Sequence, residues 1–182
     1  MRPVSGLLLV GVLMLVGPLG CDLLGNLSRV GTTYTIEFEV PPVQPNSNFS
    51  ATQQANFKAK LDSIMRANNI SDSDLNNARV DSIRFTILSP SNGTFDFVQS
   101  ISIWLSSPSL GEQQVLGAGP GSISPGRNSV VLPALPTADI LAYIRGGPFT
   151  ARAEGRSTST GTSTTYRIQA VLYTNISFDV FP

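Results

Sequence analysis

The sequence predicts a mainly β fold, an antiparallel β-sandwich of about seven to nine strands with two helices. Three observations lead to this class. Apolar and polar residues alternate along several segments, as they do in strands that have one buried and one solvated face. Only two segments space their apolar residues as a helix does. Most connections are too short for the helical crossovers that parallel strands require, so antiparallel pairing is favoured.

The first predicted strand covers residues 34–40, where apolar residues alternate with Thr and Glu, and two prolines end it. The next predicted element is an amphipathic helix over about residues 51–67. Ser50 and Gln53 have the spacing of a capping box, which satisfies free N–H groups at a helix start. One helical stripe then collects four apolar residues, which are Phe57, Leu61, Ile64 and Met65.

The middle of the chain is predicted to form strands. Residues 80–88 and 95–105 are two strand-like runs, and the segment between them contains Asn92-Gly93, a dipeptide typical of tight turns. Weaker strands are expected around residues 113–116 and 129–132.

A short helix is predicted at about residues 137–145. Asp139 lies in its first turn, Arg145 lies in its last turn, and Gly146-Gly147 follows it, which is the charge and glycine pattern of a helix. Alternation resumes at residues 149–153. After a segment rich in Ser, Thr and Gly, most apolar residues from position 166 to position 180 share one parity, which predicts either one long strand or two collinear strands.

The composition excludes several classes of function. The chain has 182 residues, 12 Lys and Arg, 12 Asp and Glu, one Cys and no His. A formal net charge of zero gives no field that would attract phosphates, so we expect no nucleic-acid partner. Histidine is the commonest general base and metal ligand, and its absence leads us to expect no enzymatic activity and no cofactor.

The N-terminal segment has the pattern of a secretory signal. Arg2 supplies a positive charge, residues 4–16 form an apolar core, and Gly17-Pro18 breaks it. The apolar core has about 13 residues, whereas a membrane-spanning helix needs roughly 20. Residues 1–20 are therefore predicted to be a signal peptide that is removed.

Directly after this segment, Leu19-Gly20-Cys21 resembles the lipobox of bacterial lipoprotein precursors. The resemblance implies cleavage before Cys21 and attachment of lipid to its thiol. It also implies a location in the cell envelope, with the outer membrane or cell surface preferred over the inner membrane. A lone cysteine in an exported chain has no internal disulfide partner. The alternative is an ordinary secreted protein with a free thiol near its start.

Residues 21–31 are then the lipidated N-terminus and a short tether, and residues 32–182 form a single β-sandwich domain. The tether is apolar, unlike a free polar linker, because it contains Leu23, Leu24, Leu27 and Val30. We therefore expect the domain to lie close to the membrane.

Trp104 is the candidate ligand-binding residue. In the run 95–105 it falls on the more polar face, where an indole ring can stack on a sugar. The alternative is that the helix predicted at 51–67 covers this face and makes Trp104 part of the core.

A candidate calcium site contains Asp72, Asp74 and Asn76, whose alternate spacing matches the first oxygen ligands of an EF-hand loop. The loop lacks the turn glycine and the bidentate glutamate, since Asn77 and Ile83 occupy those positions. The alternative is a local turn or helix start capped by Ser71.

Glu37 and Glu39 form the one carboxylate pair to consider for hydrolysis, because they project from the same face of a strand about 7 Å apart. A solvated strand face explains them equally. The main hypothesis is a membrane-anchored, non-enzymatic β-sandwich for binding, adhesion or envelope assembly, with a glycan or envelope protein as partner. The alternatives are a carbohydrate-binding module that uses Trp104, and a carboxylate-dependent hydrolase.

Overall fold

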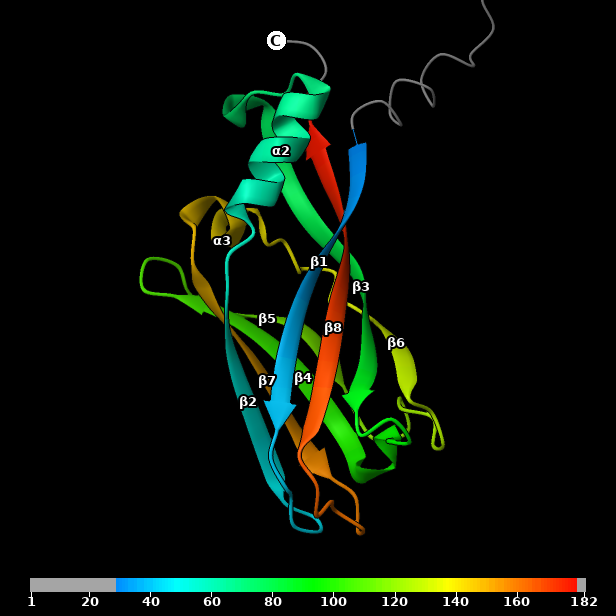
Figure 1. The fold of residues 1–182 in the computed structure, drawn as a ribbon. Helices are drawn as coiled ribbons and strands as arrows, with labels where there is room; N and C mark the ends of the chain where they lie inside the picture. Colours follow the sequence, from blue (N-terminus) through cyan, green and yellow to red (C-terminus); the bar gives the residue numbers. More distant parts are fainter. Residues whose placement is uncertain (1–28, 180–182) are drawn as a thin grey trace, which may run out of the picture.

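Eight strands form two antiparallel sheets that face each other (Figure 1). The computed structural model describes residues 29–179. The order is β1-β8-β3-β6 in one sheet and β2-β7-β4-β5 in the other. The strands are β1 (Arg29–Val40), β2 (Asn48–Ala55), β3 (Leu75–Ser89), β4 (Val98–Ser107), β5 (Gly111–Ala118), β6 (Ser129–Pro133), β7 (Phe149–Ser157) and β8 (Tyr166–Phe178). The predicted antiparallel β-sandwich is confirmed.

The alternation in the sequence places the core between the two sheets. Tyr34, Ile36, Phe38 and Val40 of β1 are buried, while the glutamates between them are exposed. The second sheet contributes buried residues to the same core. On β4 these inward residues are Ile101, Ile103 and Leu105. Because each strand buries alternate residues, a shift of one residue in register would expose the whole apolar set.

Two helices lie outside the sheets, α2 (Lys58–Asn68) and α3 (Leu141–Gly146). Both lie toward the end of the sandwich where β1 begins and β8 finishes (Figure 1). Helix α2 buries Leu61, and the aromatic ring just before it, Phe57, stacks on Tyr34 of β1. Neither helix among residues 29–179 is long and apolar enough to cross a bilayer.

The start of the helix predicted at residues 51–67 was wrong. Residues 48–55 form strand β2, which pairs with β7 from Asn48 opposite Arg156 to Ala55 opposite Phe149. Phe49 and Ala51 are buried and their neighbours are exposed, which is strand periodicity. Ser50 and Gln53 therefore make no capping box. Pairing with β7 outweighs the local helix signal.

Two other elements begin later in the structure than the sequence predicts. The short helix begins at Leu141, because Asp139 is held against β3 by a hydrogen bond from the Ala78 N–H to its carboxylate (3.0 Å). The strand predicted at 95–105 begins at Val98, because Phe95–Phe97 forms a 3-10 turn.

Candidate binding surface around Trp104

Trp104 lies on the outward face of β4, in the middle of the second sheet. Its register neighbours are Arg152 of β7 and Gln114 of β5. The residue is half-buried. Helix α2 packs beside β1 and α3 at the end of the sandwich, so it does not turn Trp104 into a core residue (Figure 1). The placement of Trp104 on the more polar sheet face agrees with the parity of its strand.

A charged side chain accompanies the indole. The Arg152 guanidinium lies 5.7 Å from the centre of the Trp104 ring, within the range of a cation–π contact. Arg152 also pairs with Glu112 of β5 at 2.5 Å and with Glu154 on its own strand. These two carboxylates hold the guanidinium beside the ring. The indole Nε1 is buried and has no hydrogen-bond partner within residues 29–179.

A shallow hollow of about 510 Å³ lies on the same sheet, next along β4 from Trp104. Its polar lining residues are Asn48, Ser50, Ser100, Ser102, Glu154 and Arg156. Ser102 connects the two features, since it lies two residues from Trp104 on the same face of β4. Hydroxyl, amide, carboxylate and guanidinium groups beside an aromatic ring match the chemistry of a sugar, which offers hydroxyls and an apolar ring face.

Sequence reasoning identified Trp104 but missed its charged neighbours. Glu112 lies on β5, which follows β4 directly in a hairpin, whereas Arg152 and Glu154 stand far from Trp104 along the chain and only the pairing of β4 with β7 brings them to it. No local spacing signals that pairing.

The glutamates of the predicted carboxylate pair lie on the outward face of β1. They line a groove of about 540 Å³ between β1 and β2. Glu37 pairs with Arg167 of β8 at 3.1 Å. Among the residues that line this groove, Glu37 and Glu39 are the only acids. Glu37 and Glu39 are thus charged side chains on the outward face of β1, a strand at the edge of its sheet.

The three residues of the predicted calcium site have separate partners. Asp72 pairs with Arg145 at 3.0 Å, and Asn76 donates to Asp179 at 2.8 Å. Asp74 accepts from the hydroxyl and the N–H of Ser71, and these hydrogen bonds lower the pKa of its carboxyl group. The capping box at Ser71 is present. Between residues 29 and 179, no three carboxylates or cysteines gather as metal ligands would.

Cys21, the predicted lipidation residue, lies outside the described residues, as do the predicted signal peptide and most of the tether.

No known protein family and no characterised relative matches this chain. The solved structures that are weakly similar to it include the following two. One is from Desmodium yellow mottle tymovirus, with 11% identity over 100% of this chain and 97% of that chain, and a TM-score of 0.27. The other is the empty head of turnip yellow mosaic virus, with 14% identity over 100% and 93% of the two chains and a TM-score of 0.27. Similarity this low carries no argument about function.

Proposed function

We propose that this protein is a lipoprotein of the bacterial cell envelope, whose non-enzymatic β-sandwich is held at a membrane by lipid on Cys21 and acts there in binding, adhesion or assembly. The observation that carries the proposal is Leu19-Gly20-Cys21, which stands directly after the apolar segment and contains the only thiol in the chain. Each acyl CH₂ in the bilayer contributes about 0.8 kcal/mol, so two or three chains anchor the protein stably.

The start of the sandwich fits a short anchor. Seven residues separate Cys21 from Arg29, where β1 begins, and they span at most about 25 Å when fully extended. The end of the sandwich that carries α2 would therefore face the membrane (Figure 1).

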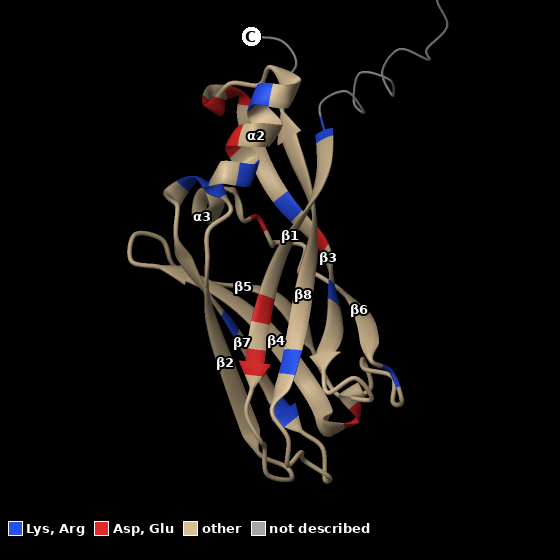
Figure 2. Ribbon diagram, viewed as in Figure 1, with Lys and Arg blue, Asp and Glu red and all other residues tan. Residues whose placement is uncertain are grey.

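The opposite end would face away from the membrane. It carries the loops at 41–47 and 158–165, which contact each other through the Val43 and Thr162 backbones at 2.8 and 2.9 Å. Neither loop contains a charged residue, and Figure 2 shows them without charge, whereas charges of both signs gather around α2. A neutral, hydroxyl-rich end suits contact with a glycan or an envelope protein better than contact with nucleic acid.

Metabolic labelling with palmitate tests the anchor. The full-length protein expressed in a bacterial host should take up label and fractionate with membranes, and Cys21→Ser should lose both properties. A Ser5→Ala variant, which alters the leader but keeps the thiol, is the matched control. The lipoprotein proposal fails if the wild type stays unlabelled or if Cys21→Ser keeps its label.

Carbohydrate binding through Trp104 is the second candidate. The Trp104 indole beside Arg152 and the adjacent polar hollow favour it. A glycan array would identify a ligand, and Trp104→Ala should weaken its binding at least tenfold because stacking provides most of the apolar contact. Tyr173→Ala, which removes a half-buried aromatic from the outer face of the other sheet, should leave binding unchanged. Equal binding by wild type and Trp104→Ala would exclude this site.

A further inference from the structure

We propose that the groove between β1 and β2 binds an extended, basic peptide segment of a partner protein, which adds to the sheet as a strand. We call this feature the edge groove, and its polar lining residues are Thr35, Glu37, Glu39, Thr52, Gln54 and Arg167. It lies where the edge strands of the two sheets run side by side, and it measures about 540 Å³ (Figure 1). This site is separate from the Trp104 surface.

The free backbone groups of β1 are identified by one side chain. The Lys60 ammonium group of α2 donates a hydrogen bond to the Thr33 carbonyl, so this carbonyl points away from β8. In a strand, the N–H and C=O of one residue point to the same side, and successive residues alternate. Thr35, Glu37 and Glu39 therefore direct their N–H and C=O groups into the edge groove.

The facing groups of β2 follow from the same rule. The Ser157 N–H donates to the Ser47 carbonyl at 2.9 Å, so Ser47 points toward β7. Ser50, Thr52 and Gln54 have the opposite parity and direct their backbone groups toward β1. The described chain pairs β1 only with β8 and β2 only with β7. The free edge of β1 thus offers alternating donors and acceptors with which an extended peptide can pair, and β2 lines the other side of the groove.

The other side of the sandwich is closed in two ways. The Leu135 N–H donates to the Val115 carbonyl at 2.9 Å, which covers part of β5. On β6, Pro133 has no N–H to offer and lies at a position that faces away from β3. Proline at such a position protects a sheet edge from pairing with another chain. The walls of the edge groove contain no proline.

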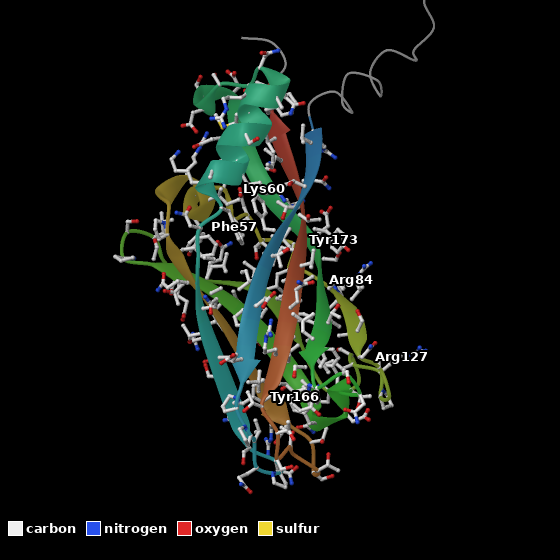
Figure 3. All side chains as sticks on the ribbon, in the orientation of Figure 1. Phe57, Lys60, Arg84, Arg127, Tyr166 and Tyr173 are labelled. Atoms are coloured by element: carbon white, nitrogen blue, oxygen red, sulfur yellow. The ribbon has the colours of Figure 1, made fainter. Side chains whose placement is uncertain are left out.

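The length of the free edge is limited by α2. Lys60 occupies the Thr33 carbonyl, and Phe57 lines the same end of the edge groove. Figure 3 shows both side chains where α2 meets β1. An added strand therefore pairs with the part of β1 from Thr35 to Val40.

The glutamates of the edge groove favour a basic peptide as its ligand. Arg167 pairs with Glu37 at 3.1 Å, and Glu39 has no ion-pair partner among residues 29–179. Lysine or arginine at alternate positions of an added strand would lie opposite these carboxylates, which stabilises a cross-strand pair. A second copy fits less well. Antiparallel pairing of two β1 strands over this stretch, centred on Glu37, would place Glu37 opposite its own equivalent, and like charges opposite each other are destabilising.

A synthetic peptide tests the edge groove. The probe is acetyl-Thr-Val-Lys-Val-Lys-Val-Thr-amide with a fluorophore, titrated by anisotropy to millimolar concentration against the full-length protein in detergent. We expect saturable binding and shifts of the Thr35, Glu37 and Glu39 amide protons in NMR spectra. A peptide with glutamate in place of lysine, and one N-methylated at alternate residues, should not bind.

Matched variants locate the site. Thr35→Pro removes one N–H that faces the groove and no hydrogen bond to β8, so it should weaken binding about three- to tenfold. Val131→Pro makes the same change on the free edge of β6, where the side chain is 54% exposed, and should not affect binding. Thermal unfolding checks that both variants fold.

The proposal is overturned by any of three results. The first is that the basic peptide does not bind, and the second is that the glutamate peptide binds equally well. The third is that Thr35→Pro and Val131→Pro both bind the basic peptide as the wild type does. Concentration-dependent dimerisation that Thr35→Pro abolishes would assign the groove to a second copy instead.

Discussion

The ring of Tyr34 lies nearly parallel to the ring of Phe57, with centroids 4.4 Å apart and an interplanar angle of 19°. Phe57 also meets Phe149 edge-on at 5.2 Å. Tyr34 belongs to β1 and Phe149 to β7, so the ring that precedes α2 contacts both sheets. This aromatic cluster closes one end of the sandwich and positions α2 there.

Phe57→Ala should lower the free energy of unfolding by about 3–5 kcal/mol, because it removes a buried ring and leaves a cavity between the sheets. Urea denaturation followed by Trp104 fluorescence measures the change. Phe57→Leu, which keeps most of the apolar volume, should cost clearly less. Equal small losses in both variants would contradict the bridging role of this ring.

Tyr34 should make the protein sensitive to alkaline pH. Burial raises the pKa of the Tyr34 hydroxyl from 10.0 to about 12, and the hydroxyl has no hydrogen-bond partner within residues 29–179. The pKa of Tyr34 is higher in the folded than in the unfolded protein. The stability that depends on a neutral Tyr34 hydroxyl is therefore fully present below pH 10 and is lost as the pH rises toward 12. Tyr34→Phe should unfold less readily over that interval and should be neutral or up to about 1 kcal/mol more stable at pH 7. An unchanged alkaline profile would disprove this assignment.

Asp96 should contribute to stability against acid. Its carboxylate accepts hydrogen bonds from the Gly126 N–H at 2.5 Å and from the Thr94 hydroxyl at 2.7 Å, and these lower the pKa of Asp96 from 3.8. The contribution is present above pH 3.8 and is lost as the pH falls through the lowered folded pKa. Because Asp96 is exposed, Asp96→Asn should cost less than about 1 kcal/mol at pH 7. Unfolding curves of the variant and the wild type, measured from pH 7 to 2, should approach each other at the acid end.

Gly155→Ala tests the close packing of β7. A Cβ atom at this position would come within 2.4 Å of the Phe49 ring and of the Ser100 carbonyl oxygen. The substitution should lower the free energy of unfolding by about 1–3 kcal/mol or more. Gly119→Ala is the control, because no atom lies within 4 Å of its Cβ position. If the two variants melt at the same temperature, the register of β2, β7 and β4 around Gly155 is wrong.

Alternation was enough to predict the sandwich, because each strand buries one face. It was not enough at residues 48–55. Phe49 and Ala51 alternate there over a short stretch, while Phe57 and Leu61 continue at helical spacing just beyond. A window that spans both segments favours the helix. Pairing of β2 with β7 depends on residues about a hundred positions away, so no local pattern reveals it.

The candidate surface was predictable only in part. The parity of β4 placed Trp104 on the polar face, and the structure agrees. Its neighbour Arg152 depends on the pairing of β4 with β7, which a single sequence does not encode locally, whereas Glu112 belongs to the hairpin that β4 forms with β5. The groove between β1 and β2 likewise arises from two strands that belong to different sheets.

Intact-mass and N-terminal analysis of the mature protein, extracted from the membranes of a bacterial host, tests the proposed anchoring most directly. If Cys21 is the lipidated residue, the mature chain begins at Cys21 and carries the mass of attached acyl chains. A mature chain that begins at another residue, has a bare thiol and is recovered from the culture medium would contradict it.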